Sequence, residues 1–500
     1  MSSMLLSELL ENTQATPSID CEIHGLSLNS RTAIRGAAFF AIQGSTQHGA
    51  CFARQAVDNG AAAIVHDGLG TLPSDLPESI SVTSLESARE HLGALAARFY
   101  NSNSAHRKVT AFTGTNGKTS CVLNFADLAK RCGLCSGVIG TLGWGRADQL
   151  VSTGLTTPDV FTVHEIAQAL LEQGCDSIAL EASSHALDQG RLDGLNIGTA
   201  VFTNISRDHL DFHQTIDRYA AAKSRLFQRA EIENAIVNID SDFAQRMIES
   251  APGSAQLIRY SVRDSAADVY AENILFHERG SCFDVLTPWG KDRFELNQMG
   301  EFNIANLLAV VAALCVEGVP FTGLAEAVSQ LGTVPGRMQL VPLDGVAMPR
   351  TIVDYAHSPD ALEQVLSAAS KHCKGKLWVL FGCGGDRDRG KRAEMAQVAE
   401  SHAVRIVVTS DNPRSEDPER IISDIVKGFT SSDLASPHIH VELDRQRAIE
   451  WAIDTAHPED CLLIAGKGHE KFQIVGDKKI PFDDVLVAQS ALQRRVEQVL

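Results

Sequence analysis

Short apolar runs alternate with stretches of helical periodicity over much of the chain. Between about residue 103 and about residue 335, the apolar runs that have the character of buried strands are 109–113, 177–181, 200–204 and 235–239. Such alternation favours a parallel or mostly parallel sheet with helices on its faces. The first hundred residues contain shorter apolar stretches, such as 37–42, followed by turn-forming residues, and they predict a small α/β unit.

Two segments rich in turn-forming residues divide the chain. The polar segment 101–108 precedes a strand-like run, and the segment Gly332-Thr-Val-Pro-Gly336 contains the residues that commonly break helices and strands. After it, a new series of apolar runs alternates with helical segments, at 351–354, 377–381, 405–409, 438–441 and 461–465. This rhythm is typical of a doubly wound, Rossmann-like sheet, whose ligands bind beyond the carboxyl ends of the strands.

The pattern therefore predicts an α/β protein with three domains. We expect a small α/β N-terminal domain over 1–102, a central domain with a mostly parallel sheet over 103–335, and a Rossmann-like C-terminal domain over 336–500. The length of 500 residues agrees, since domains average about 150 residues. Hydrophobic residues make up 44% and charged residues 21% of the chain, which excludes collagen-like and mainly disordered proteins.

Charge and cysteine content narrow the possible partners and the compartment. The 62 Asp and Glu against 44 Lys and Arg give a net charge of -18, so no general basic field exists to hold a nucleic acid. Eleven scattered cysteines indicate a reducing compartment. The N-terminal residues lack the basic region of a signal peptide, and the most apolar run, 304–316, is too short for a membrane span. We expect a cytoplasmic protein without a membrane span or a nucleic-acid partner.

The strongest chemical signal is the segment Thr113-Gly-Thr-Asn-Gly-Lys-Thr-Ser120, which follows an apolar strand and opens an amphipathic helix. Glycines and the helix N-terminus would turn backbone N–H groups toward phosphate, Lys118 would reach the outer phosphates, and Thr119 would bind Mg²⁺. Phe112 replaces the first glycine of the usual pattern, so this is a variant loop. The central domain is expected to be of the P-loop type, and the expected nucleotide contacts in the loop are Gly114, Thr115, Asn116, Gly117, Lys118, Thr119 and Ser120.

Further motifs follow in order along the chain. They are Glu181-Ala-Ser-Ser-His185, Asn204-Ile-Ser-Arg-Asp-His-Leu-Asp211, Tyr219-Ala-Ala-Ala-Lys223, Gly300-Glu-Phe-Asn-Ile-Ala-Asn306 and Pro335-Gly-Arg337. Together with the loop, this series resembles the Mur ligases, ATP-dependent amide-forming enzymes of peptidoglycan precursor synthesis. The resemblance covers nearly the whole chain.

The resemblance implies how ATP and magnesium are bound. Thr119, Glu181, His209 and a Lys223 carbamylated by CO₂ would hold Mg²⁺, and Lys118, His209 and Lys223 would be the catalytic residues. Asn303 matches a residue near the adenine, while Arg337 and Asp354 match groups that reach the nucleotide from the hinge and the C-terminal domain. Taken alone, Glu181 is also explained as a strand-end carboxylate with local donors, His209 as a structural histidine, Lys223 as the edge of a packed helix, and Asn303 as a helix N-cap.

The segment Asp411-Asn-Pro-Arg414 resembles the diaminopimelate signature of this family. A guanidinium can grip the second carboxylate of meso-diaminopimelate, which a lysine substrate lacks. The same residues would also form a proline turn before a helix capped by Asp417. The residues that the resemblance places at the amino acid are Arg387, Asp411, Asn412, Pro413, Arg414, Gly466 and Glu470.

Residues of the first two domains match the site for the UDP-sugar peptide. The N-terminal set, which turn chemistry explains equally well, is Leu28, Ser30, Ser45, Thr46 and Gln47. The central set is Thr156, Thr157, Ser183, Gln189 and Arg191.

The resemblance implies an ATP-dependent ligase that joins meso-diaminopimelate to UDP-N-acetylmuramoyl-L-alanyl-D-glutamate through an acyl phosphate, in cell-wall biosynthesis. Its expected partners are these small molecules, and a monomer is expected. A lysine-adding ligase, a folylpolyglutamate synthase and a nucleotide-dependent regulatory protein without catalysis are the alternatives. Arg414 argues against the lysine-adding ligase. The first domain and the Asp411–Arg414 signature argue against the synthase. The joint presence of Lys118, Glu181, His209 and Lys223 argues against the regulatory protein.

Overall fold

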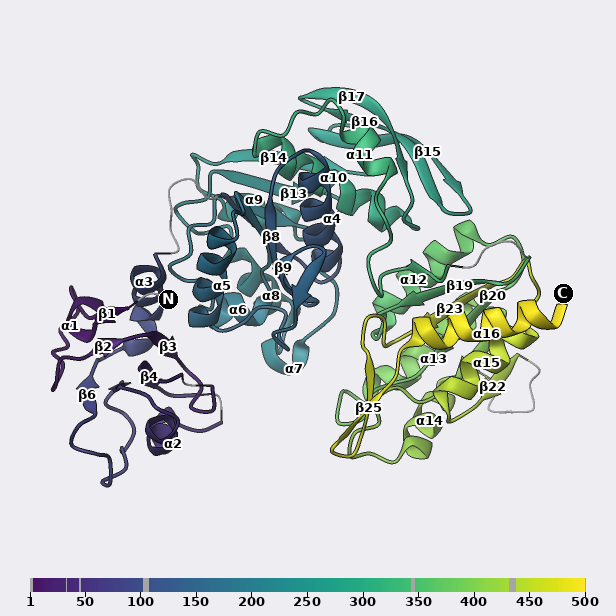
Figure 1. The fold of residues 1–500 in the computed structure, drawn as a ribbon. Coiled ribbons are helices and arrows are strands. Elements are labelled where there is room, and N and C mark those ends of the chain that lie inside the picture. The colour runs from purple at the N-terminus through teal and green to yellow at the C-terminus, as the bar shows by residue number, and fades with distance from the viewer. Residues whose placement is uncertain are drawn as a thin grey trace.

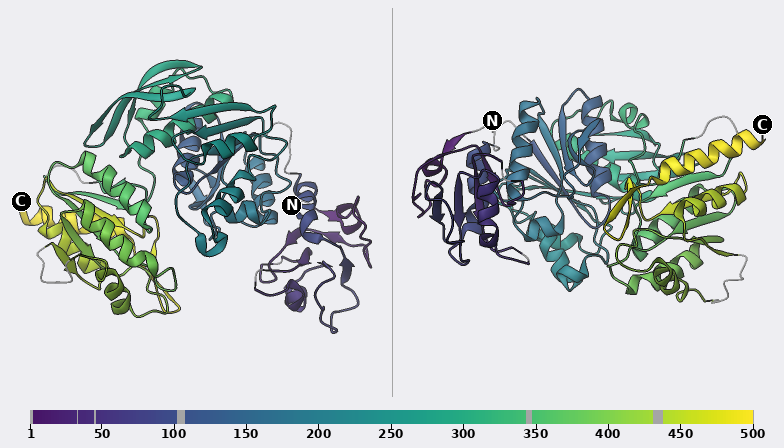
Figure 2. Two further views of the ribbon diagram at one scale, coloured as in Figure 1. Left: turned by 180° about the vertical axis from the view of Figure 1, so that it is seen from behind. Right: turned by 60° about the horizontal axis from the view of Figure 1, so that its bottom comes forward.

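The computed structural model describes residues 3–32, 34–44, 46–101, 108–342, 347–430 and 438–499. Three α/β bodies follow one another along an arc, with the central body at its apex and the chain ends at opposite sides (Figure 1). The view from behind shows the same order (Figure 2). The predicted three-domain α/β architecture is confirmed. The expected boundary between 102 and 103 lies outside the described residues, and the boundary between 335 and 336 stays a prediction.

The N-terminal body is built on a parallel four-stranded sheet in the order β3-β4-β5-β6. All five residues of β4 are buried, as expected for a strand covered on both faces. The strands are β1 (Met4–Leu5), β2 (Glu22–Ile23), β3 (Gly25–Ser27), β4 (Ala37–Ala41), β5 (Ala63–His66) and β6 (Ser81–Ser84). The helices are α1 (Leu6–Leu9), α2 (Ala53–Asp58), α3 (Ala88–Tyr100) and a 3₁₀ helix over Gly49–Phe52.

The central body contains an eleven-stranded sheet in the order β10-β9-β8-β11-β7-β12-β13-β14-β15-β16-β17. The pairs from β8 to β15 are parallel and the pairs at both edges are antiparallel, so the expected mostly parallel sheet is confirmed. The strands are β7 (Lys108–Thr113), β8 (Ser136–Gly140), β9 (Gly143–Arg146), β10 (Gln149–Val151), β11 (Ser177–Glu181), β12 (Thr199–Phe202), β13 (Asn234–Asn238), β14 (Gln256–Ser261), β15 (Val269–His277), β16 (Gly280–Thr287) and β17 (Gly290–Leu296).

The central body also contains helices, several of which pack on this sheet. The helices are α4 (Lys118–Arg131), α5 (Val160–Glu172), α6 (Ser184–Asp188), α7 (Leu210–His213), α8 (Ile216–Ser224), α9 (Ala244–Ser250), α10 (Glu301–Val316) and α11 (Leu324–Ser329). The apolar run 304–316 lies in α10, which shares one hydrophobic cluster with α4 and is buried along most of its length. Within the described ranges, none of the helices has the length and apolarity needed to cross a membrane.

The strand expected at 200–204 ends earlier, at Phe202. Asn204 leaves the ladder because its side chain is bonded to the phosphate loop: its Nδ2 donates to the carbonyl of Asn116 at 3.1 Å, and its Oδ1 accepts from the Asn116 N–H at 3.0 Å. Thr203 also donates its hydroxyl to the Asn116 carbonyl, at 2.6 Å. The neighbouring strand end therefore holds the loop in place.

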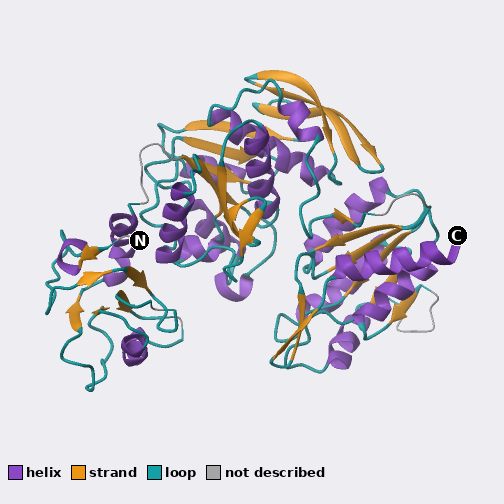
Figure 3. Cartoon of the chain, viewed as in Figure 1, coloured by secondary structure: helices purple, strands orange, loops and turns teal. Residues whose placement is uncertain are grey.

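The C-terminal body has a six-stranded sheet in the order β18-β19-β23-β20-β21-β22, parallel except for the edge strand β18. Separate hydrophobic clusters on its two faces confirm the doubly wound fold. The strands are β18 (Gln339–Leu340), β19 (Arg350–Asp354), β20 (Leu377–Phe381), β21 (Arg405–Val408), β22 (Ile439–Val441), β23 (Cys461–Ala465), β24 (Phe472–Val475) and β25 (Lys478–Pro481). The helices are α12 (Pro359–His372), α13 (Gly390–His402), α14 (Pro418–Val426), α15 (Arg445–Thr455) and α16 (Asp484–Val499). The hairpin β24–β25 is separate from the main sheet (Figure 3).

His372 joins the central and C-terminal bodies. Its Nδ1 lies 2.6 Å from the carbonyl of His277 and donates to it, while its Nε2 accepts from the Gly300 N–H at 3.1 Å. Ion pairs between Arg350 and Glu278 and between Lys371 and Glu301, each at 3.0 Å, lie at the same junction. These contacts fix one side of the space between the two bodies.

Glu317 follows α10 and makes the stability of the folded chain depend on pH. Its carboxylate accepts from the Thr110 hydroxyl, and burial raises its pKa from 4.5 to about 7. A raised carboxyl pKa means that the folded state retains a proton that the unfolded chain releases, so stability is lost as the pH rises from 4.5 to 7. Glu317→Gln is expected to remove this loss, worth up to about 3 kcal/mol. Melting temperatures of both proteins between pH 5 and pH 8 would test it, and parallel curves would contradict it.

Candidate active site

The phosphate loop connects β7 to the N-terminus of α4. Gly114 and Gly117 have φ values of 153° and 90°, and a Cβ would lie 1.9 Å from the Thr203 hydroxyl at the first and 2.3 Å from Asn306 Oδ1 at the second. Only glycine fits both positions. Lys118 folds over the loop, and its Nζ donates to the carbonyls of Gly114 (2.8 Å) and Thr115 (2.9 Å). A phosphate bound by the loop would therefore replace these two carbonyls as the partner of the Lys118 ammonium.

The loop opens on a cleft of about 850 Å³ between the central and C-terminal bodies. Residues 115–120 line one side, and residues 354–358, at the end of β19, line the other. Expected site residues on this lining are Thr115, Asn116, Gly117, Lys118, Thr119, Ser120, Thr156, Glu181, Ser183, His209, Arg337 and Asp354. Within the described part of the chain, the lining does not include Gly114, Asn303, Lys223, Thr157, Gln189 or Arg191, nor the residues expected at the amino acid.

Glu181 ends β11 with its carboxylate almost completely buried. The hydroxyls of Thr119 (3.0 Å) and Thr141 (3.1 Å) donate to Oε2, and the Thr141 N–H donates to Oε1 at 2.8 Å. The hydrogen-bond donors that would satisfy Glu181 as a structural carboxylate at a strand end are therefore present. Thr119 and Glu181 also bring hard oxygen atoms together beside the loop, which suits Mg²⁺.

The metal-binding capacity of this site depends on other ligands as well. Among the described residues, no three His, Cys, Asp or Glu side chains converge in a metal-binding group. Mg²⁺ commonly takes one or two carboxylates and completes its shell with substrate phosphates and water. The donor set of Thr119 and Glu181 fits that mode of binding, in which the nucleotide supplies further oxygens.

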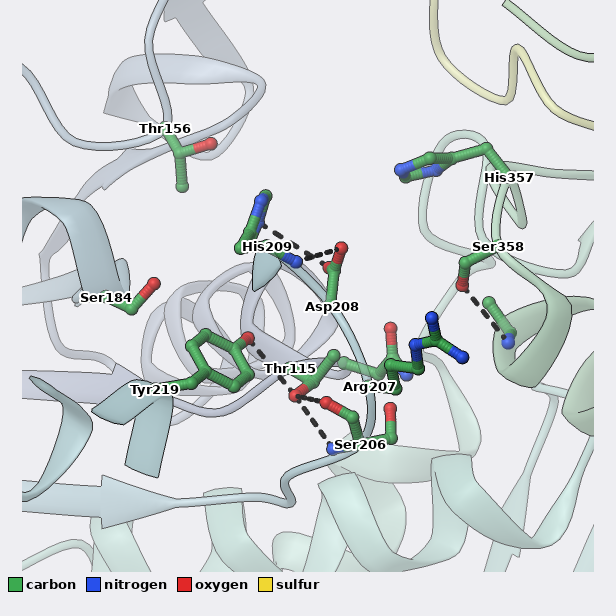
Figure 4. A network of polar contacts seen from close by, with 12 residues as sticks. Thr115, Thr156, Ser184, Ser206, Arg207, Asp208, His209, Tyr219, His357 and Ser358 are labelled. Carbon is green, nitrogen blue, oxygen red and sulfur yellow. Dashed lines mark hydrogen bonds and ion pairs between the residues drawn. The ribbon is translucent and has the colours of Figure 1, made fainter. Parts of the chain in front are cut away.

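His209 lies at the edge of the cleft, with φ of 52° and its side chain half exposed. Its Nε2 is 3.5 Å from Asp208, and its ring contacts His185 at a centroid distance of 4.9 Å. Burial and the nearby Lys118 and Lys223 lower its pKa, despite Asp208. Figure 4 shows His209 and Asp208 facing the gap toward His357 and Ser358. A neutral imidazole in this position has a nitrogen free to bind a cation.

Lys223, on α8, is 1% exposed. Its Nζ donates to the Gly114 carbonyl at 2.6 Å, the carbonyl that Lys118 also binds, and it lies 4.4 Å from the centre of the Tyr219 ring. Burial and the charge of Lys118 hold its pKa well below the usual range. Lys223 is therefore not a solvated lysine at a helix edge but a buried amine behind the phosphate loop.

Asn303 does not cap a helix, so that explanation is wrong. The N-cap of α10 is Gly300, and Asn303 lies in the first turn with its Nδ2 donating to the Met299 carbonyl at 2.8 Å. Its side chain also contacts Asn306, whose Nδ2 donates to Asn303 Oδ1 at 3.3 Å. The pair stiffens the helix end beside Gly117.

Arg337 and Asp354 approach from the hinge. Arg337 Nη2 lies 3.5 Å from the Thr119 hydroxyl, and the guanidinium stacks 4.6 Å above the Tyr355 ring. Asp354 accepts from the N–H groups of Met338 and Ala356, each at 2.7 Å, and burial raises its pKa. Asp354 thus holds the hinge segment while it lines the cleft.

The central residues expected at the sugar peptide form one hydrogen-bonded chain. Arg191 donates to Gln189 Oε1 (2.7 Å) and to the Thr157 carbonyl (2.8 Å). The Thr157 hydroxyl donates to the Glu181 carbonyl at 2.7 Å and lies 3.0 Å from Ser183 Oγ. The Thr156 hydroxyl lies 3.1 Å from that of Thr141, which donates to the Glu181 carboxylate. The chain therefore runs from the surface to Glu181 at the cleft.

The N-terminal set shows a different arrangement. Ser30 is buried and donates to Gln55 at 2.7 Å, Leu28 is half-buried, and Thr46 and Gln47 are exposed next to the turn in which the Gly44 N–H binds the Gln47 carbonyl at 3.1 Å. Ser45 lies outside the described residues. The structure does not bring the described residues of this set, Leu28, Ser30, Thr46 and Gln47, to the cleft, and turn chemistry accounts for their local conformation.

The residues expected at the amino acid gather at the carboxyl ends of β20, β21 and β23. Arg414, with φ of 52°, donates to the Gly385 carbonyl at 2.8 Å, and both Arg414 and the exposed Arg387 lie against Gly384. Asn412 donates to Glu470 at 2.8 Å. The buried Pro413 precedes a helix that Asp417 does cap, so the structural explanation of this segment holds beside the functional one. Gly466, with φ of 115°, lies against Asp411.

Comparison with known proteins decides the family. The model of the Mur ligase family catalytic domain matches residues 22–100, that of the Mur ligase middle domain matches 112–314, and that of the Mur ligase glutamate ligase domain matches 336–468. The chain belongs to the Mur ligase family. Its expected resemblance to these enzymes is confirmed.

Individual relatives match the Mur ligase over its full length. A UDP-N-acetylmuramoyl-L-alanyl-D-glutamate–2,6-diaminopimelate ligase of Coxiella burnetii is 41% identical over 496 residues, which are 98% of this chain and 100% of the relative. A Xylella fastidiosa ligase of the same name is 42% identical over 98% of this chain and 97% of the relative. A solved structure of a ligase with that name superposes with a TM-score of 0.70 at 34% identity, covering 99% of this chain and 100% of the other.

Several residues of this Mur ligase site were not expected from the sequence. Thr141 gives Glu181 two hydrogen bonds, Tyr219 joins the Thr115 hydroxyl at 3.2 Å beneath Lys223, and Lys467 lies buried among the amino-acid residues. Tyr219 and Lys467 belong to motifs that resemble those of the family, so the sequence did contain a signal that could have placed them in the site. No sequence pattern marks Thr141, because it is the pairing of β8 with β11 that brings this residue to Glu181.

Proposed function

We propose that this Mur ligase joins meso-diaminopimelate to UDP-N-acetylmuramoyl-L-alanyl-D-glutamate with ATP. Relatives with that name match the chain from end to end. The observation that carries the choice of amino acid is the pair Arg387 and Arg414 at Gly384, in a cluster that also holds the carboxylates of Asp411 and Glu470. Guanidinium groups suit a carboxylate, and carboxylates suit an ammonium, so the cluster matches a zwitterion with a further carboxylate.

Catalysis in this proposal comes from positioning and charge. The D-glutamate carboxylate attacks the γ-phosphorus, an O–P bond forms, and ADP leaves with its electron pair; Lys118 turns from its loop carbonyls to the transferring phosphoryl group. The amino nitrogen then attacks the acyl phosphate, and phosphate leaves as the amide forms and the nitrogen loses a proton. Arg337, which already reaches Thr119 from the hinge, adds positive charge beside the phosphates.

We infer that Thr119, Glu181, His209 and a carbamylated Lys223 hold magnesium. Bound Mg²⁺ would offset the negative charge of the phosphate oxygens. Carbamylation forms an N–C bond between the neutral Lys223 amine and CO₂ and releases one proton, which leaves a carbamate anion; the ammonium form would first lose another proton. Its support is the burial of Lys223 beside Lys118, where both Nζ atoms donate to the Gly114 carbonyl. Action as a cytoplasmic monomer also stays a prediction.

Phosphate release from ATP tests the function. With the UDP-sugar dipeptide, release is expected with meso-diaminopimelate and not with L-lysine or without an amino acid, and mass spectrometry should identify the tripeptide product. Turnover with lysine would favour the lysine-adding alternative, and no turnover with any amino acid would favour a regulatory protein.

Arg414→Met should reveal the role of the guanidinium. We expect kcat/KM for diaminopimelate to fall by about 10- to 100-fold, the value of one charge-assisted hydrogen-bonded contact. The matched control is Arg420→Met, an exposed arginine on α14, which should leave kcat/KM unchanged. An equal loss in both variants would contradict the assignment of Arg414.

A further inference from the structure

Lys467 is a completely buried cation at the centre of the amino-acid cluster. Its Nζ donates to Asn412 Oδ1 and to Glu470 Oε2, each at 3.1 Å, and lies 3.8 Å from Asp411 Oδ1. A buried ammonium is costly unless anions and acceptors surround it, so this arrangement is specific. Neither the phosphate chemistry nor the grip of Arg414 on a carboxylate requires this lysine.

The charges around Lys467 do not cancel. Asp411 and Glu470 contribute two carboxylates and Lys467 contributes one ammonium. A further buried cation, Arg445, is paired with Asp484 through two hydrogen bonds of 2.7 Å, both partners being fully buried. Among the described residues, the buried Oδ1 of Asp411 has no hydrogen-bond partner. This acidic end of the site therefore retains one negative charge.

Lys467 also fixes the orientation of Asn412. Asn412 Oδ1 accepts from Lys467 and from the Ile474 N–H of β24, at 3.0 Å, so its Nδ2 must face Glu470. Without a cation at this point the amide could turn, and Glu470 would lose the donor that sets its position. One side chain thus controls both charge and geometry.

We propose that Lys467 is a positioning and specificity-determining residue that leaves the acidic end with a single negative charge, matched to one substrate ammonium, and thereby favours an amino acid without net charge over one with a net positive charge. The inference rests on the proposed function in that an amino acid binds at this cluster. It extends the role of the cluster from gripping the distal carboxylate to selecting the net charge of the substrate.

Loss of the Lys467 charge should shift the preference of the site toward a more cationic amino acid, because two carboxylates would then be uncompensated. Lys467→Gln removes the charge but can still donate to Asn412, while Lys467→Met removes both. The double variant Lys467→Gln with Asp411→Asn removes one charge of each sign and so restores the net charge of the cluster.

The experiment measures kcat/KM for meso-diaminopimelate, which has no net charge, and for L-lysine, which has one positive charge. In Lys467→Gln the ratio of lysine to diaminopimelate is expected to rise by at least about tenfold, with KM for ATP unchanged, and the double variant should return the ratio toward that of the unchanged chain. Lys467→Met should show the same shift with a further rise in both amino-acid KM values. The matched control is Lys471→Met, an exposed lysine four residues along, paired with Asp483.

The outcomes separate the inference from the proposed function. An equal loss for both amino acids in Lys467→Gln, or no recovery in the double variant, would overturn the inference. Unfolding of all three variants in thermal melts would overturn it too, because Lys467 would then be structural. If the unchanged chain turned over lysine but not diaminopimelate, the proposed substrate would be wrong. The role of the Lys467 charge would still be tested, since a lower lysine KM in Lys467→Gln would support it and an unchanged or higher one would overturn it. Turnover with neither would overturn both.

Discussion

Lys223→Met is expected to lower kcat by about 10²- to 10³-fold, the usual loss when one group that stabilises developing charge is removed. Lys223 lies behind the phosphate loop, 1% exposed, and binds the Gly114 carbonyl together with Lys118. As a carbamate it would offer anionic oxygens behind the phosphate loop. Methionine has a similar length and no charge, so the loop should keep its fold while the anion is lost. Steady-state phosphate release with saturating ATP would measure the effect.

Two controls distinguish a carbamate from a simple lysine. Lys223→Glu restores a carboxylate and should retain more activity than Lys223→Arg, which keeps the positive charge but cannot be carbamylated. Removing CO₂ and bicarbonate should slow the unchanged chain and not Lys223→Glu. If Lys223→Arg were the more active variant and bicarbonate had no effect, Lys223 would act as a cation and the carbamate would be wrong.

The phosphate loop could be predicted from the sequence because its chemistry is local. Strand, loop and helix are contiguous, and the glycine at 117 is required by a φ of 90° and by the closeness of Asn306. The strand expected at 109–113 begins one residue earlier, at Lys108, and that expected at 177–181 coincides with β11. Buried parallel strands give continuous apolar runs, which are easy to recognise.

The antiparallel edge of the central sheet could not be predicted in the same way. Strands β15 to β17 alternate buried and exposed residues, so they lack long apolar runs. Strand order was also inaccessible, because β7 lies between β11 and β12 although both follow it by more than 60 residues in the chain. That order is what brings Glu181 and Asn204 to the loop.

In the amino-acid site, too, contacts between distant parts of the chain could not be predicted. Arg414 and Glu470 could be assigned from motifs, whereas the ion pair that supports them could not. Arg392, fully buried on α13, donates to Glu416 at 3.0 Å, and Glu416 in turn accepts from the Asp386 N–H at 2.7 Å. The two loops that carry the arginines proposed to bind the amino acid are thus tied through a partner that no local pattern marks.

Asp484→Ala is expected to lower the free energy of unfolding of the C-terminal body by about 3–5 kcal/mol. The substitution leaves the guanidinium of Arg445 buried without its carboxylate. Arg445 also donates to the carbonyls of Ala465 (3.0 Å) and Ser410 (3.4 Å), which directly precede Gly466 and Asp411. Faster hydrogen exchange of the amides of β21 and β23 would show the loss, and KM for the amino acid should rise with it.

Two comparisons make the Asp484 result specific. Asp454→Ala breaks an exposed pair with Arg494, 3.2 Å apart, and should change stability by less than about 1 kcal/mol. The double variant Arg445→Met with Asp484→Leu removes both buried charges and should be more stable than Asp484→Ala alone, because the main cost is the unpaired guanidinium. If the double variant were the less stable of the two, the pair itself, with its bonds to the strand ends, would be what holds this edge of the sheet together.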